Sequence, residues 1–137
     1  MRFLLDTNCW MQIARRRDRY QEVAELLRHV PPSAVSITDY ALHSLMNIAR
    51  RHEMLAQLPG FIARSGFGVT VEVVTVTATR LGDVAEAIAK YQLDVDDAYQ
   101  YIAAEAYGLK LVSLDADFDR TPNGRLTPAA ALQLFQG

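Results

Sequence analysis

Short apolar runs alternate with amphipathic stretches along the whole chain, and this alternation most limits the folds open to it. Extended runs are expected at 2–5, 34–37, 69–77 and 109–114, and apolar residues at helical spacing separate them. The run at 69–77 is almost wholly β-branched, as a strand should be. Strands that are separated by helices pair in parallel through right-handed crossovers, and helices cover both faces of such a sheet. The sequence therefore predicts an α/β fold with a central parallel sheet.

Capping residues indicate where the helices begin and end. Gly108 is expected to stop a helix because glycine adopts the left-handed conformation at little cost. A proline at the first helical position suits the last helix, which Pro128 begins. The expected amino-terminal caps are Asp18, Thr38 or Asp39, Asp96 or Asp97, and Thr127.

Length and composition predict one domain spanning 1–137, because half of the 137 residues are apolar and can form a substantial core. The single cysteine, Cys9, excludes an internal disulfide, and with three scattered histidines it argues against a zinc site. No run approaches the roughly 20 apolar residues that span a bilayer, and no signal-peptide pattern follows Met1. We expect a cytoplasmic protein with no membrane segment.

The charges are more segregated than the net charge of −2 suggests. The first 68 residues hold nine Arg against six Asp and Glu, whereas the rest hold five Lys and Arg against ten acids. A basic surface beside an acidic pocket suits a polyanionic substrate held by its phosphates and a cation at the reaction centre. Ordinary solvated surface charge explains the same pattern.

Four aspartates fall at strand ends or helix starts although they lie far apart in sequence. Asp6 follows the first strand, Asp97 opens a helix, and Asp115 and Asp117 follow the last strand. Ligands bind outside the carboxyl ends of parallel strands, so we expect these carboxylates to share one pocket. Clustered carboxylates repel until a divalent cation neutralises them, and oxygen ligands without His or Cys favour Mg²⁺ or Mn²⁺. Taken singly, Asp6, Asp97 and Asp115 are each better explained as a cap or turn former, but together they favour a metal site.

Several motifs resemble those of the PIN-domain ribonucleases, particularly the VapC-like toxins of bacterial toxin–antitoxin pairs. They are LLDTN at 4–8, Asp97 with Ala98, Gly108 eleven residues later, and Asp115 within LVSLDADF. The resemblance extends over 3–118. It implies a Rossmann-like α/β/α sandwich and an endoribonuclease site that depends on Mg²⁺ or Mn²⁺.

The resemblance also implies residue roles and partners. Asp6 and Asp97 would be primary acids, and Asp115 would complete the cluster. RNA would be the substrate, and the protein would form a homodimer with an antitoxin that covers the active site. The implied metal ligands are Asp6, Asp97, Asp115 and Asp117, with Asn8 and Ser113 as supporting polar residues.

One family feature is missing. The family usually has a Glu three residues after the Thr that follows the second strand, but Ala41 stands at that distance from Thr38. Asp39 is the nearest carboxylate and therefore a candidate catalytic acid, with His43 one turn along on the same face. A role as a helix cap alone explains Asp39 equally well.

Two other functions remain open. The absent Glu favours a catalytically eroded PIN-like domain that binds RNA or a protein without cutting. A strand that ends in Asp-Thr is also shared by haloacid dehalogenase-like phosphatases, but these need a second Asp where Asn8 stands.

Overall fold

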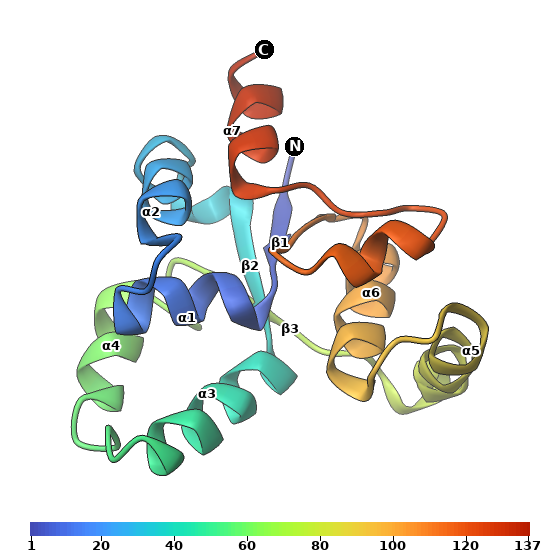
Figure 1. Cartoon of the computed structure of the whole chain (residues 1–137), viewed down its shortest axis with the longest axis horizontal. Coiled ribbons are helices and arrows are strands. Elements are labelled where there is room, and N and C mark those ends of the chain that lie inside the picture. The colour runs from blue at the N-terminus through green and yellow to red at the C-terminus, as the bar shows by residue number, and fades with distance from the viewer.

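A four-stranded parallel sheet lies at the centre of the computed structural model, which describes residues 1–137 (Figure 1). The strand order is β3-β2-β1-β4, and every neighbouring pair is parallel. In the register, Phe3 lies opposite Val35 on one side and Lys110 on the other. The predicted α/β fold with a central parallel sheet is confirmed. The strands are β1 (Phe3–Leu5), β2 (Val35–Thr38), β3 (Glu72–Val74) and β4 (Lys110–Val112).

Seven α-helices and three short 3₁₀ turns surround the sheet, and none of the helices has both the length and the apolar character needed to cross a membrane. The helices are α1 (Thr7–Arg15), α2 (Tyr20–His29), α3 (Asp39–Arg51), α4 (Leu58–Ser65), α5 (Leu81–Tyr91), α6 (Val95–Tyr107) and α7 (Pro128–Gln136). The 3₁₀ turns are η1 (Pro32–Ala34), η2 (Ala78–Arg80) and η3 (Ala116–Arg120).

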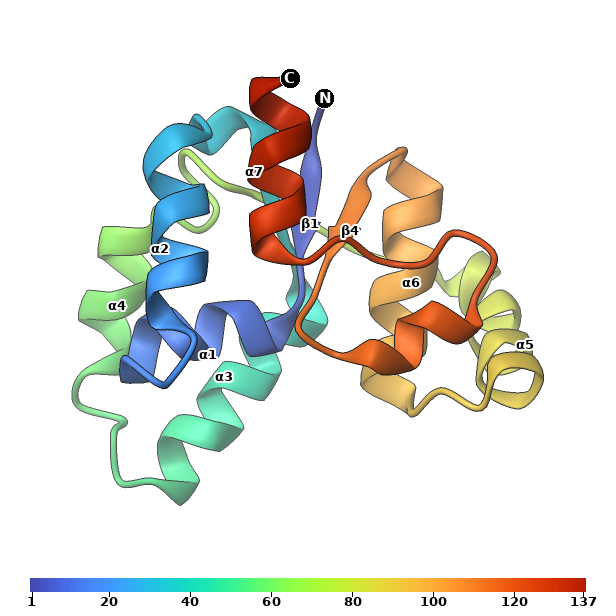
Figure 2. The same cartoon turned by 45° about the horizontal axis from the view of Figure 1, so that its top comes forward.

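Helices cover both faces of the sheet, as the buried strands require. Successive strand residues point to opposite faces. Phe3 and Leu5 of β1 therefore join one core with α1, α2, α4 and α7, whereas Leu4 joins a second core with α5 and α6. Figures 1 and 2 show these two helical layers, with the two chain termini side by side at one end. The result is the expected α/β/α sandwich.

The third strand is much shorter than predicted. Instead of 69–77, β3 covers Glu72–Val74, because a turn occupies the start of the β-branched run. Gly66 and Gly68 have positive φ angles of 76° and 77°, and the Gly66 carbonyl accepts hydrogen bonds from three successive N–H groups. Val69 is consequently 88 % exposed. Turn formation by the glycines overrides the β propensity of the following residues.

Two predicted helix caps are wrong. No side chain caps α2, which follows Arg19 rather than Asp18. Helix α6 is capped by Asp94, whose carboxylate accepts the backbone N–H of Asp97 at 2.7 Å. Asp96 and Asp97 therefore both lie within the first turn of α6. Three other expectations are confirmed: Gly108 ends α6 at φ 65°, Thr38 caps α3 and Thr127 caps α7.

Candidate metal centre

The carboxyl ends of the strands converge on one edge of the sheet, where three helices or turns begin. Strand β1 lies between β2 and β4. The chain segments that follow β2 and β4 therefore leave the sheet on opposite sides of β1. In parallel sheets, ligands bind outside the carboxyl ends of the strands at such a point. Asp6 follows β1 directly and caps α1, accepting the backbone N–H of Thr7 at 2.8 Å.

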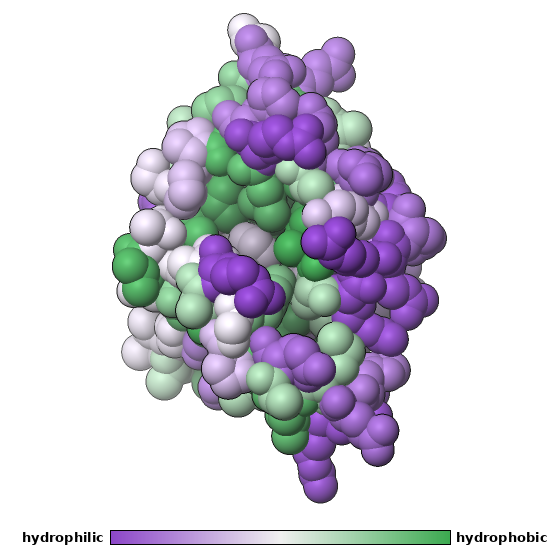
Figure 3. Space-filling view, turned by 90° about the vertical axis from the view of Figure 1, so that its left-hand side faces the viewer, coloured by the Kyte–Doolittle hydropathy of each residue, from purple (hydrophilic) through white to green (hydrophobic).

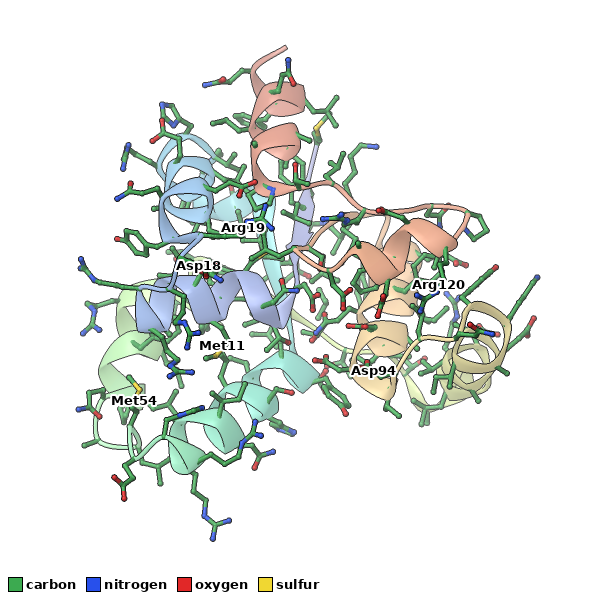
Figure 4. The ribbon with its side chains drawn as sticks, in the orientation of Figure 1. Met11, Asp18, Arg19, Met54, Asp94 and Arg120 are labelled. Carbon is green, nitrogen blue, oxygen red and sulfur yellow. The ribbon has the colours of Figure 1, made fainter.

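Three carboxylates from two segments come together at this edge of the sheet. The nearest side-chain oxygens of Asp97, Asp115 and Asp117 all lie within 4.8 Å of one another. Asp97 is buried, Asp115 is half-buried and Asp117 is exposed. Asp117 also forms an ion pair with Arg120 at 3.0 Å, and Arg120 donates to the carbonyls of Tyr91 and Gln92 at the end of α5 (Figure 4).

Asp6 is linked to this group through Ser113. The Ser113 hydroxyl donates to Asp6 Oδ2 at 2.7 Å and accepts the backbone N–H of Asp115 at 3.0 Å. The Asn8 side-chain amide donates to the same hydroxyl at 3.2 Å. Asp6 itself is only 2 % exposed. The structure thus brings Asn8 and Ser113 next to the acids, and fixes the orientation of the Asp6 carboxylate.

Burial and mutual repulsion make these carboxylates hard to ionise. Burial raises the pKa of Asp6 to about 7, against the hydrogen bond from Ser113, and the charges of Asp96 and Asp115 add to the rise. Burial also raises the pKa of Asp97 to about 8, together with the charges of Asp6, Asp94 and Asp115. Two acids that retain protons near neutral pH indicate a site with excess negative charge.

The donor set fits a hard divalent cation. All the candidate ligands are carboxylate oxygens, which Mg²⁺ and Mn²⁺ prefer, and no His or Cys joins them. A cation of charge +2 would remove the repulsion that raises the pKa of Asp6 and Asp97. The amino ends of α1 and α6, which carry partial positive charge, already favour negative groups here.

Asp96, the residue beside Asp97, lies close enough to Asp6 for its charge to raise the Asp6 pKa, although the family spacing had favoured Asp97 alone. Its Oδ1 accepts from the Gln100 side-chain amide at 3.2 Å, and the same amide nitrogen donates to Thr7 Oγ1 at 3.3 Å. Burial raises the pKa of Asp96. The i, i+4 spacing of Asp96 and Gln100 was the available signal, since such pairs meet on one helix face.

A family model described as the PIN domain matches residues 3–124. The chain belongs to the PIN domain family. The resemblance seen in its motifs is thereby confirmed, and PIN domains are nucleases. No curated protein sequence matches the chain.

Solved structures of toxin–antitoxin proteins share the fold of this PIN domain. A toxin–antitoxin complex from Klebsiella pneumoniae gives a TM-score of 0.72 at 20 % identity, covering 92 % of this chain and 97 % of that chain. VapBC2 from Rickettsia felis, bound to a DNA fragment from its promoter, gives a TM-score of 0.69 at 20 % identity, covering 92 % of this chain and 97 % of that chain. VapC20 from Mycobacterium tuberculosis, a toxin that cleaves the sarcin–ricin loop, gives a TM-score of 0.69 at 18 % identity, covering 90 % of this chain and 96 % of that chain.

Asp39 does not belong to the group formed by Asp97, Asp115 and Asp117. Its Oδ1 accepts from the Tyr99 hydroxyl at 2.7 Å and from the Tyr40 N–H at 2.9 Å. Burial and the bond to Asp39 raise the pKa of Tyr99 to about 12, so the phenol remains a donor. Ala41 is fully buried, and His43 is exposed on α3.

Proposed function

We propose that this PIN domain is a divalent-metal-dependent endoribonuclease that hydrolyses RNA phosphodiester bonds, with residues 1–137 acting as one domain. The observation that carries the proposal is the group formed by Asp97, Asp115 and Asp117, whose carboxylate oxygens lie within 4.8 Å of one another. Asp6 adjoins this group through Ser113. A binding module would gain nothing from holding buried acids whose pKa values are raised to about 7 and 8.

The acids would have two roles, binding the metal and supporting the acids that bind it. Asp6, Asp97 and Asp115 would be the primary acids, and Asp117 would support them from the exposed edge. A bound Mg²⁺ or Mn²⁺ supplies an acidified water and neutralises charge that develops on the phosphate. Ser113 keeps Asp6 in one orientation, and Asn8 holds Ser113 in turn. Asp39, engaged by Tyr99, would act at most from the margin of the site.

A basic surface lies within reach of the acids and suits an RNA backbone. Helices α1 and α3 both begin at the carboxyl edge of the sheet, and their carboxyl ends meet where Arg15 contacts His52 at 3.3 Å. With nine and 13 residues, the two helices span about 13 and 20 Å. Phosphates at that distance from the cut site would contact the cations gathered there, and salt would weaken binding. The cations at these two helix ends are Arg15, Arg16, Arg17, Arg50 and Arg51.

The direct test is RNA cleavage by the purified protein on mixed RNA, with Mn²⁺ and with chelator. We expect cleavage with Mn²⁺, none in chelator, and none with Asp97→Asn, which removes a charge and little volume. Asp18→Asn is the matched control, because Asp18 is exposed in the connection between α1 and α2 (Figure 4). If RNA is bound but never cut, the protein is the eroded binding module instead.

We also propose that the protein is the toxin of a type II toxin–antitoxin pair and that its antitoxin binds an apolar groove. The groove has a volume of about 450 Å³, and 15 of its 21 lining residues are hydrophobic. Its walls come from α1, α2, α3 and α4, with Met11 of α1 and Met54 of the connection between α3 and α4 among the lining residues (Figure 4). On this face, apolar residues surround a hollow with hydrophilic residues around it (Figure 3).

An amphipathic helix with acidic residues is the occupant that this groove fits best. Arg15, Arg16 and Arg64 line the groove and would pair with the acids of the partner. The groove and the metal centre lie toward opposite ends of α1, so a segment continuing about 13 Å along that helix would reach the acids. Such a partner would block both the basic surface and the catalytic acids. The fold shared with toxin–antitoxin structures supports this partner.

Co-expression with a small upstream gene would test the partner. We expect a stable complex that lacks ribonuclease activity. Ala14→Arg places a long side chain in the groove and should abolish the complex, while leaving cleavage by the free protein unchanged. A complex that survives Ala14→Arg would place the antitoxin elsewhere.

A further inference from the structure

Gln100 is a polar side chain in a place where the chain has no structural need of one. It is fully buried in α6, within the core that α5 and α6 form against the sheet. Its amide nitrogen donates to Asp96 and Thr7, but its oxygen Oε1 has no hydrogen-bond partner. Buried polar atoms without partners are rare because they cost stability, so such an atom in a native fold needs an explanation.

The amide end of Gln100 lies beside the metal centre. Thr7 Oγ1 accepts from Gln100, and the backbone N–H of the same Thr7 donates to Asp6. Thr7 therefore connects Gln100, which holds Asp96, to Asp6. Asp97, the next residue of α6, carries the neighbouring carboxylate of the group with Asp115 and Asp117.

A helix cap does not explain Asp96. The capping role in α6 is already filled by Asp94, whose carboxylate accepts the Asp97 N–H. The helix dipole favours any acid in the first turn, but it does not require a fixed direction of the side chain. Asp96 is instead half-buried and tied to a buried amide, and that arrangement fixes the direction of its carboxylate.

We propose that Asp96 is a further carboxylate of the metal centre and that Gln100 is the residue that positions it beside Asp6. The proposal rests on the metal-dependent function above. It gives the centre a further acid near Asp6, in a chain that has Ala41 where the family pattern has Glu. Gln100 acts only through Asp96 and Thr7, and its unpartnered oxygen is the stability cost of that positioning.

Titration calorimetry with Mn²⁺ alone, on the full chain, tests this. Partners that orient a metal ligand typically contribute about ten- to a hundredfold in affinity, so we expect Asp96→Asn and Gln100→Leu each to raise the Mn²⁺ Kd at least about tenfold. Gln100→Leu should also melt at the same or a higher temperature in chelator, since it replaces a half-satisfied amide with an apolar side chain. Asp18→Asn should match wild type.

The outcomes separate the two proposals. If wild type binds Mn²⁺ and Asp97→Asn does not, but Asp96→Asn and Gln100→Leu bind like wild type, Asp96 is surface charge and the inference is overturned. If Gln100→Leu lowers the Tm in chelator and leaves Kd unchanged, Gln100 serves packing alone and its positioning role is overturned. If wild type does not bind Mn²⁺, the proposed function and the inference fail together.

Discussion

Replacing Asp97 with Asn should stabilise the protein when no cation is bound. Burial and neighbouring acids raise the pKa of Asp97 to about 8 in the folded chain, whereas an unfolded Asp titrates near its ordinary 3.8. The folded state therefore holds a proton that the unfolded state has lost, and stability falls as pH rises between about 4 and 8. The contribution is fully present below that window and absent above it. Asn carries no charge at any of these pH values, so the variant does not lose this stability as the pH rises.

The size of the effect follows from the pKa and from the contacts. One pKa unit is worth about 1.4 kcal/mol, so a rise from 3.8 to about 8 sets an upper limit of roughly 6 kcal/mol. Asn remains buried, loses about 0.3 to 1 kcal/mol of favourable interaction with the amino end of α6, and leaves the repulsion between Asp6 and Asp115 in place. We therefore expect a gain of about 1 to 2 kcal/mol, or roughly 3 to 10 °C in Tm.

Differential scanning calorimetry in chelator at about pH 5 and about pH 9 measures this directly. The variant should gain most at the higher pH and least at the lower one. Saturating Mn²⁺ should reverse the order, because a ligand at a hundred times its Kd stabilises wild type by about 2.7 kcal/mol and Asp97→Asn binds it poorly. A variant that melts lower than wild type at both pH values would show that Asp97 is a helix-turn acid and refute the reasoning.

Three further expectations concern the surroundings of the site. Ser113→Ala removes the donor to Asp6 and the acceptor for Asp115, so the Mn²⁺ Kd should rise about ten- to a hundredfold and kcat for RNA cleavage should fall. Asp39→Asn should reduce kcat much less than Asp97→Asn, because Tyr99 already holds its carboxylate; equal losses would make Asp39 a primary acid. The family resemblance predicts a homodimer, which light scattering at high micromolar concentration would detect, and a monomer there would contradict it.

The sequence was informative for features that a residue and its neighbours in the chain determine. Apolar runs at strand spacing predicted β1, β2 and β4, and the acids that follow β1 and β4 had to meet because parallel strands end at one edge. Gly108 and Thr127 fixed a helix end and a helix start through their own backbone and hydroxyl chemistry. These features needed no knowledge of distant contacts.

Features that depend on distant contacts could not be predicted. Tyr99 binds Asp39 across 60 positions, and nothing near Asp39 in sequence shows that its carboxylate is engaged. Gln100 drew no expectation from the sequence, and the fold buries it beside Thr7. The doublet Asp96-Asp97 likewise left open which side chain faced inward. The structure places Asp97 with Asp115 and Asp117, and the charge of Asp96 acts on Asp6.

Paired titrations of Mn²⁺ binding and RNA cleavage, on one preparation of wild type and one of Asp97→Asn, test the central claim most directly. If Asp6, Asp97, Asp115 and Asp117 form a centre that cuts RNA, cleavage should rise with Mn²⁺ in parallel with calorimetric saturation, and both should be lost in the variant. Cleavage that persists in chelator, or equal cleavage by Asp97→Asn, would contradict the account.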